Sequence, residues 1–243
     1  MRAAVLSDIH GNLPALEVVL AAIAAARPDA VWCLGDLVGY GPWPNEVTAL
    51  VRDQADVCLV GNHDLVALDA AGVGLDEFNR EAAEAALWTR RELNDETRTF
   101  LHSLAPQASQ NGTGLYHASP RDPVWEYVLS GEAAAGAFAA VPDSLILVGH
   151  SHVALASTLA GGRLSLDVAP AGTELELTAR HLLNPGSVGQ PRDGDPRAAW
   201  LMLDLEGRAA RFERVDYDVR RTQDEMRARG LPSPLADRLA AGL

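Results

Sequence analysis

The stretch AAVLSDIHGN, residues 3–12, is the part of the chain that decides the fold class. A short apolar run ends abruptly in a polar turn, and Pro14 then opens a helical pattern that continues to Ala26. Proline suits the first turn of a helix because its missing N–H would be unpaired there in any case. The stretch therefore predicts a strand, a polar turn and a helix, in that order.

The same order of elements recurs twice further along the chain. The apolar run 30–34 ends at Gly35-Asp36, and the run 56–60 ends at Gly61-Asn62-His63-Asp64, with a helical pattern over 44–51 between them. Strand, turn and helix repeated at this spacing are typical of parallel βαβ units. In open α/β sheets the ligand site lies at the carboxyl ends of the strands, and all three polar clusters are expected there.

The rest of the chain adds helices and then a β-rich half. Within 65–104, two segments have helical spacing, which predicts either a cap over the site or a pair of outer helices. Strands are expected at 115–117 and 145–148, with a helix over 131–140 between them. Beyond residue 153 shorter apolar runs alternate with turns, which favours antiparallel strands, and the tail 217–239 is predicted to be helical. Because we find no repeat or linker, we expect one domain over 1–243, with 65–104 as a helical insertion or cap.

The composition is that of a globular protein, with 48% hydrophobic and 22% charged residues. A net charge of −13 argues against a broad nucleic-acid-binding surface, since such surfaces neutralise phosphates with Lys and Arg. No secretory pattern opens the chain, and no segment approaches the roughly 18 apolar residues that span a bilayer, so a cytoplasmic location is expected. Cys33 and Cys58 lie in apolar runs and are expected to be buried thiols on neighbouring strands.

Polar side chains at the predicted strand ends combine the ligand types of a metal centre. They are Asp8, His10, Asp36, Asn62, His63, His117, His150 and His152, and they include five of the seven histidines in the chain. Carboxylate, amide and imidazole ligands suit divalent metals such as Mn, Fe or Zn. A carboxylate such as Asp36 can bridge two ions, and a pair of ions can clamp phosphate oxygens and activate water. The set therefore points to metal-assisted phosphate chemistry.

In this order, the motifs resemble those of the calcineurin-like metallophosphoesterase superfamily. The matching segments are Asp8-Ile9-His10, Gly35-Asp36, Gly61-Asn62-His63-Asp64, the isolated His117 and Gly149-His150-Ser151-His152. In addition, Asn184-Pro185-Gly186-Ser187 resembles a segment of the family's bacterial phosphodiesterase branch. The resemblance implies an α/β fold, a two-sheet β-sandwich flanked by helices in four αββα layers. That fold agrees with the βα first half and β-rich second half.

The resemblance also implies roles for the site residues. One ion would be held by Asp8, His10, Asp36 and His152, and a second by Asp36, Asn62, His117 and His150. His63 would stay free of metal and either protonate the leaving oxygen or stabilise the charge of the transition state. A hydroxide bridging the two ions would be the nucleophile. The ions are expected to be Mn or Fe, although the same ligands accept Zn, Ni or Co.

The chain differs from one branch of the family in the residues that follow Gly35-Asp36. In the protein Ser/Thr phosphatases the Gly-Asp motif continues with an Asp that orients the catalytic histidine and an Arg that grips phosphate. Gly39 and Tyr40 stand at those positions here. The departure favours small phosphodiesters or nucleotides over phosphoproteins and leaves the residue that orients His63 unidentified. We do not assign that role to Asp64, because neighbouring residues often face apart.

Three further residues are candidates for contact with substrate. Asn12 would either bind substrate or cap the helix after it, and we favour the cap. Tyr40 would line a substrate pocket or pack its own loop. Arg192 would contact a phosphate, unless the neighbouring Asp193 and Asp195 hold it in ion pairs.

The sequence thus predicts a metal-dependent phosphodiesterase or phosphatase that acts on a small phosphorylated substrate. A dinucleotide polyphosphate hydrolase, which cleaves an anhydride, and a protein Ser/Thr phosphatase are alternatives within the enzyme class. A non-catalytic scaffold on the same fold is the alternative outside it. The presence of His63 favours an enzyme, since the retromer subunit that resembles this family has lost its catalytic histidine.

Overall fold

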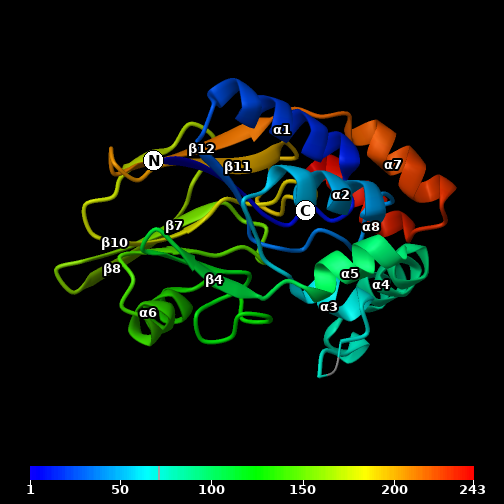
Figure 1. Cartoon of the computed structure of the whole chain (residues 1–243), viewed down its shortest axis with the longest axis horizontal. Helices are drawn as coiled ribbons and strands as arrows, with labels where there is room; N and C mark the ends of the chain where they lie inside the picture. Colours follow the sequence, from blue (N-terminus) through cyan, green and yellow to red (C-terminus); the bar gives the residue numbers. More distant parts are fainter. Residues whose placement is uncertain (71) are drawn as a thin grey trace.

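Two six-stranded sheets packed face to face form the centre of the molecule in a computed structural model that describes residues 1–70 and 72–243 (Figure 1). The first sheet runs, edge to edge, β3 (Val57–Cys58), β2 (Ala30–Cys33), β1 (Arg2–Leu6), β11 (Ala198–Asp204), β12 (Ala209–Val215) and β9 (Glu174–Glu176). The second runs β4 (Gln107–Gln110), β5 (Thr113–Tyr116), β6 (Leu145–Leu147), β10 (Arg180–Asn184), β7 (Leu155–Ala160) and β8 (Arg163–Val168). Both sheets mix parallel and antiparallel pairs, so the expected two-sheet α/β fold is confirmed.

Strand β1 shows how the sequence builds the layers. Successive side chains of a strand point to opposite faces. Ala4 and Leu6 accordingly join the core beneath the outer helices, whereas Ala3 and Val5 join the core between the two sheets. A strand buried on both faces must be apolar throughout, and this explains the continuous apolar run at the start of the chain.

Helices cover the outer faces of both sheets. On the first sheet α1 (Leu13–Ala26) packs against β11 and β12, with α2 (Pro44–Gln54) and α7 (Val219–Ala228) beside it (Figure 1). On the second sheet α6 (Gly131–Ala140) packs against β8. No helix of the described part of the chain is long and apolar enough to cross a membrane.

The parallel pairs lie where the βαβ pattern predicts them. Strands β1, β2 and β3 pair in parallel, as do β5, β6 and β10, while the pairs of the later half are mainly antiparallel. Cys33 and Cys58 lie in register on the neighbouring strands β2 and β3 and are free thiols, as expected, but only Cys33 is buried and Cys58 is partly exposed. The antiparallel strand β4 was not predicted, because its sequence QASQ contains no apolar run.

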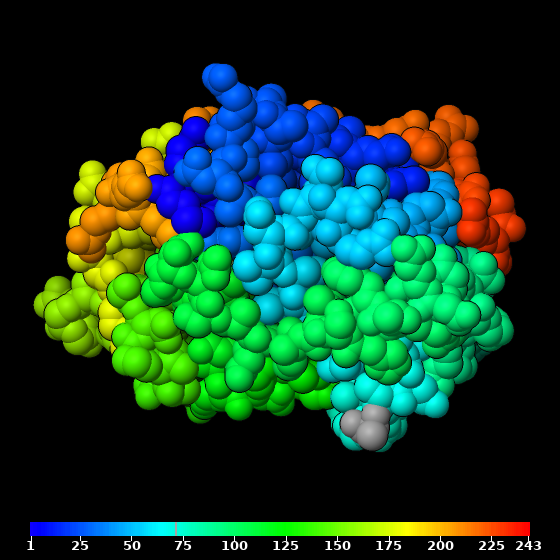
Figure 2. Space-filling view, viewed as in Figure 1, coloured from blue at the N-terminus to red at the C-terminus, as the bar shows by residue number. Residues whose placement is uncertain are grey.

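Two helical groups lie near the strand ends. The first comprises α3 (Asn62–Ala67), the 3₁₀ helix η1 (Leu75–Glu77), α4 (Arg80–Glu92) and α5 (Asp95–His102). The second comprises α7, α8 (Ser233–Asp237) and the 3₁₀ helix η2 (Arg238–Ala241) at the chain end. The first of the two helical segments expected within 65–104 begins at Arg80, because Asn79 caps it by accepting a hydrogen bond from the backbone N–H of Ala82. In Figure 2 the surfaces of α2, α4 and α5 form one continuous face.

Candidate metal centre and substrate cavity

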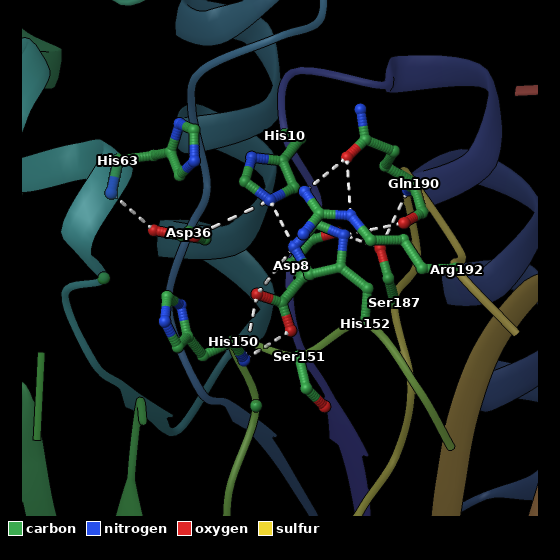
Figure 3. A network of polar contacts seen from close by, with 12 residues as sticks. Asp8, His10, Asp36, His63, His150, Ser151, His152, Ser187, Gln190 and Arg192 are labelled. Carbon is green, nitrogen blue, oxygen red and sulfur yellow. Dashed lines mark hydrogen bonds and ion pairs between the residues drawn. The ribbon is translucent and has the colours of Figure 1, made fainter. Parts of the chain in front are cut away.

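The eight polar residues from the strand ends converge on one buried site. Asp8 and His10 follow β1, Asp36 follows β2, Asn62 and His63 begin α3, His117 follows β5, and His150 and His152 follow β6. Each of the eight side chains is 5% exposed or less. Figure 3 shows that six of them, Asp8, His10, Asp36, His63, His150 and His152, gather around a common space. Buried carboxylates require a cation to compensate their charge, and buried imidazoles require partners for both ring nitrogens.

The backbone at this site is strained. Asp8, His10, Asp36, His150 and His152 have φ between 51° and 63°, and they make up five of the ten described non-glycine residues with positive φ. This left-handed conformation costs an L-residue roughly 1–2 kcal/mol. Strain of this kind persists only where the surrounding fold imposes it, and it gathers at functional sites. The turns hold five side chains in directions that ordinary backbone would not give them.

One group of ligand atoms comes from Asp8, His10, Asp36 and His152, and these atoms all lie within 4.8 Å of one another. The Nδ1–H of His10 donates to the carbonyl of Val38 at 3.0 Å, and that of His152 donates to Gln190 at 2.7 Å. Because a carbonyl can only accept, both Nε2 atoms carry a lone pair instead of a proton. These two lone pairs face each other at 3.0 Å. A cation between them fits this geometry.

A second group comes from Asp36, His117 and His150, again within 4.8 Å. His117 donates from Nδ1 to the carbonyl of Leu34 at 2.9 Å, which leaves its Nε2 facing the Oδ1 of Asn62 at 3.1 Å. His150 donates from Nε2 to the carbonyl of Trp125 at 3.1 Å, and its Nδ1 is then the unprotonated nitrogen. Asn62 therefore lies beside the same group. Its Oδ1 and the Nε2 of His117 are both acceptors, and no proton lies between them to form a hydrogen bond.

Asp36 belongs to both groups. Its Oδ2 lies 3.6 Å from the Nε2 of His10 and 3.6 Å from the Nε2 of His117. The same oxygen is buried and, in the described part of the chain, has no hydrogen-bond partner. Its other oxygen accepts the backbone N–H of His63 at 2.9 Å, which fixes the orientation of the carboxylate. The residues thus provide two adjoining His/Asp clusters consistent with a dinuclear metal site.

Burial shifts the ionisation of these groups away from their usual charged forms. It raises the pKa of Asp8 to about 7 and that of Asp36 well above its usual value. Burial likewise lowers the pKa of His10, His150 and His152 well below the usual value for imidazole. The histidines are therefore neutral and ready to donate lone pairs, while the carboxylates need a nearby cation to stay ionised at neutral pH.

His63 lies beside the clusters and is held by ring packing. Its ring centroid is 4.3 Å from that of Tyr40 and 4.4 Å from that of Phe78, and the Phe78 contact is a stack at 28°. Its Nδ1 is buried without a partner among the described residues. Asp64 does not orient it, because the two oxygens of that carboxylate accept the backbone N–H groups of Val38 and Gly61, each at 2.9 Å.

A cavity of about 380 Å³ opens over this site. Asn62, His63 and Tyr40 line it on the side of the clusters, Phe78, Trp125 and Tyr127 supply aromatic rings, and Arg192 and Arg238 supply positive charge. Glu77, Asn79 and Ala82 complete the lining, so the helical segment predicted over 65–104 forms part of the wall. The sequence did not point to Phe78, Trp125, Tyr127 or Arg238, because none of them belongs to a motif.

The three candidates for substrate contact differ in position. Tyr40 and Arg192 line the cavity. Asn12 is 1% exposed and is the N-cap of α1, accepting from Ala15 N–H at 3.3 Å and donating to the carbonyl of Gly189 at 2.9 Å. Its amide is therefore used within the fold, in the capping role that we favoured.

The two neighbouring aspartates do not pair with Arg192. Asp193 pairs with Arg214, and Asp195 pairs with Arg197 at 2.6 Å. The guanidinium of Arg192 instead donates to the Oε1 of Gln190 at 2.8 Å, a contact drawn in Figure 3.

Comparison with known proteins gives consistent results. A family model described as calcineurin-like phosphoesterase matches residues 1–154. An uncharacterised protein of Methanocaldococcus jannaschii is 37% identical over 253 residues, covering 98% of this chain and 97% of that protein. A crystal structure of a metallophosphoesterase from Sphaerobacter thermophilus is similar with a TM-score of 0.90 and 39% identity, over 100% of this chain and 99% of that one. A hypothetical protein from Pyrococcus horikoshii shares the fold, with a TM-score of 0.80 at 21% identity, over 100% and 98% of the two chains.

Proposed function

This chain belongs to the calcineurin-like phosphoesterase family, and we propose that it uses two divalent ions to hydrolyse phosphodiester bonds of small molecules or nucleotides. The observation that carries the proposal is the position of Asp36. Its buried, unpartnered Oδ2 lies 3.6 Å from an imidazole nitrogen of each cluster, as a carboxylate shared by two ions would.

We assign the ligands from the two clusters. Asp8, His10, Asp36 and His152 hold one ion, and Asp36, Asn62, His117 and His150 hold the other. Imidazole, carboxylate and amide ligands favour Mn or Fe, and they also accept Zn, Ni or Co. When bound, the two ions supply a water of lowered pKa and positive charge for the phosphate oxygens. The protein residues fix the positions and protonation states of the ligand atoms.

His63 is proposed as the catalytic residue that does not bind metal. Burial lowers its pKa well below the usual value, so the ring is neutral and carries one N–H. A neutral imidazole at the cavity wall can donate that N–H to the leaving oxygen, or hydrogen-bond a phosphate oxygen as negative charge develops. Its packing between Tyr40 and Phe78 takes the place of the orienting carboxylate found in the protein phosphatase branch.

The cavity supports a small substrate. Its volume of about 380 Å³ falls within the range of roughly 300–1,000 Å³ that is usual for small-molecule sites. The four aromatic residues of its lining, Tyr40, Phe78, Trp125 and Tyr127, suit a planar organic group, and an extended peptide needs a longer groove. For these reasons we favour a phosphodiester or nucleotide over a phosphoprotein.

The proposal is tested with purified protein stripped of metal by a chelator and then reloaded with Mn²⁺. We expect hydrolysis of bis(p-nitrophenyl) phosphate to appear with Mn²⁺, to disappear on chelation, and to exceed that of p-nitrophenyl phosphate. Undiminished activity in the metal-free protein would contradict the mechanism. Faster cleavage of a diadenosine polyphosphate than of any diester would instead assign the chain to anhydride hydrolysis. Equal background turnover in the parent and in His63→Ala would indicate a scaffold.

A further inference from the structure

Two arginine side chains lie in the wall of the cavity without a carboxylate partner. Arg192 lies in the loop between β10 and β11, and Arg238 begins η2 near the end of the chain. Most arginines of this acidic chain form ion pairs, including Arg197 and Arg214 close by. Neither Arg192 nor Arg238 does so within residues 1–70 and 72–243, although both are half-buried. Positive charge is thus kept available at this cavity in a protein whose net charge is −13.

The two guanidinium groups lie on the same aromatic ring. The Cζ of Arg238 is 4.8 Å, and that of Arg192 5.9 Å, from the ring centroid of Tyr40. Contacts of this kind position a cation but do not neutralise it. Arg192 also donates to the hydroxyl of Tyr40 at 3.3 Å. The two like charges are therefore held close to each other by one tyrosine.

Two donor atoms of the Arg238 guanidinium lack acceptors among the described residues. Its Nε and Nη2 are buried and have no hydrogen-bond partner in the described part of the chain. Burial, together with the neighbouring Arg192, lowers the pKa of Arg238, which indicates that the free protein does not stabilise this charge. An anion that accepts hydrogen bonds from both guanidinium groups would satisfy the donors and neutralise the charge at once.

The arginines are close to the candidate catalytic centre but are separate from its ligands. The ring of Tyr40, on which both lie, has its centroid 4.3 Å from that of His63 and 4.7 Å from that of His10. The lining of the cavity also contains the rings of Phe78 and Trp125, which lie 5.8 Å apart in a T-shaped contact. A group held at the arginines would thus lie beside a phosphate at the clusters, with room for a planar ring against the aromatic wall.

We propose that Arg192 and Arg238 form a second anion subsite, which binds a phosphate group of the substrate other than the one that is hydrolysed. The inference rests on the proposed function, because the clusters must hold the scissile phosphate for this group to be the second. The ligand class that fits a metal centre, a two-arginine subsite and an aromatic wall is a nucleotide with two phosphate groups. Through Arg238, a residue near the end of the chain would contribute to substrate selection.

The test is a comparison of binding between adenine nucleotides with one and two phosphate groups. Isothermal titration calorimetry would measure the dissociation constants of AMP, ADP and adenosine 3′,5′-bisphosphate for the Mn²⁺-loaded protein. The His63→Ala variant would be used throughout, because it slows turnover. We expect at least one two-phosphate ligand to bind about tenfold more tightly than AMP, as a charge-assisted pair of hydrogen bonds allows. Arg192→Gln and Arg238→Gln should each remove most of that preference and leave the affinity for AMP nearly unchanged.

Two further variants control the comparison. Arg238→Lys keeps the charge and should keep part of the preference, and Arg163→Gln, at an exposed position on β8, should leave it intact. The melting temperature of metal-loaded Arg238→Gln should not fall, since the substitution removes an unsatisfied charge. Equal affinity of the parent for AMP and both two-phosphate ligands would overturn the proposal. Equal losses of affinity for all three ligands in Arg192→Gln and Arg238→Gln would also overturn it. If the preference is present but no phosphoester is hydrolysed, the proposed function fails while the subsite stands.

Discussion

The Nε2 atoms of His10 and His152 lie 3.0 Å apart at the centre of the buried site, and neither carries a proton. The Nδ1–H of each ring donates to a backbone carbonyl, so the lone pairs of the two Nε2 atoms point at each other. This contact would be repulsive without a cation, and a divalent cation that accepts both lone pairs would make it favourable. The fold therefore holds an arrangement that a metal ion stabilises.

Metal affinity should depend on pH in a defined direction. Burial raises the pKa of Asp8 to about 7 and raises that of Asp36 well above its usual value, so a metal must displace protons from these carboxyls in neutral and acidic solution. We expect the Mn²⁺ dissociation constant, measured by competition with a chelating dye between pH 5.5 and 8.5, to fall steeply as pH rises. A constant value over that range would contradict the assignment.

The same shifts predict how the metal-free protein responds to pH. A carboxyl whose folded pKa is raised above its unfolded value destabilises the fold as pH rises between the two values. For Asp8 that window runs from about 3.9, the usual value, to about 7. We expect the rise in melting temperature on adding Mn²⁺ to be larger at pH 8 than at pH 5.5, because the ion replaces the lost protons. Differential scanning calorimetry with and without Mn²⁺ measures this difference, and an equal rise at both values would disprove it.

Asp36→Asn should empty both metal sites. The amide keeps the shape of the side chain and an acceptor for the backbone N–H of His63, which now bonds to Asp36 at 2.9 Å. It removes the negative charge that both clusters share, so each would lose a ligand. Elemental analysis after gel filtration should give less than half of the parent's metal content. Full retention of one ion would show that the carboxylate is not shared.

His63→Ala should have the opposite profile. The side chain contributes no atom to either cluster, so both ions should remain, as elemental analysis of the same preparation would show. Loss of a proton donor or charge stabiliser should lower kcat by roughly 10²–10⁴. Steady-state kinetics under saturating Mn²⁺ provide the comparison. If metal is lost together with activity, His63 is a ligand or a structural support and the assigned role is wrong.

The sequence was sufficient to predict that Asp8 and Asp36 converge, because the parallel strands β1 and β2 bring their carboxyl ends to one edge of a sheet. His150 follows β6 of the other sheet, and only the family resemblance placed it at the same site. It was not sufficient to predict Phe78 or Arg238 in the cavity. Their positions depend on how α4 and η2 pack over that edge, and packing between distant segments leaves no periodic signal. The partner of His63 was missed for a related reason. A carboxylate was sought, whereas the ring is held by stacking on Phe78, which has no sequence motif.

The last prediction concerns Gly39, whose backbone lies directly against His63. A Cβ added to Gly39 would lie 2.7 Å from the Nδ1 of His63, and the residue has a φ of +86°. Gly39→Ala should therefore displace the imidazole and also impose the backbone cost of a left-handed alanine, roughly 1–2 kcal/mol.

Gly172→Ala is a matched control, because Gly172 has a φ of +83° and, among the described residues, nothing lies within 4 Å of the added Cβ. Both variants should lose similar stability in urea titrations and keep their metal. Only Gly39→Ala should lose kcat, by about 10²-fold, the penalty expected for a catalytic group displaced by about 1 Å. Equal activity of the two variants would show that His63 can move away from Gly39 without cost, and that its position against the backbone is not part of the catalytic arrangement.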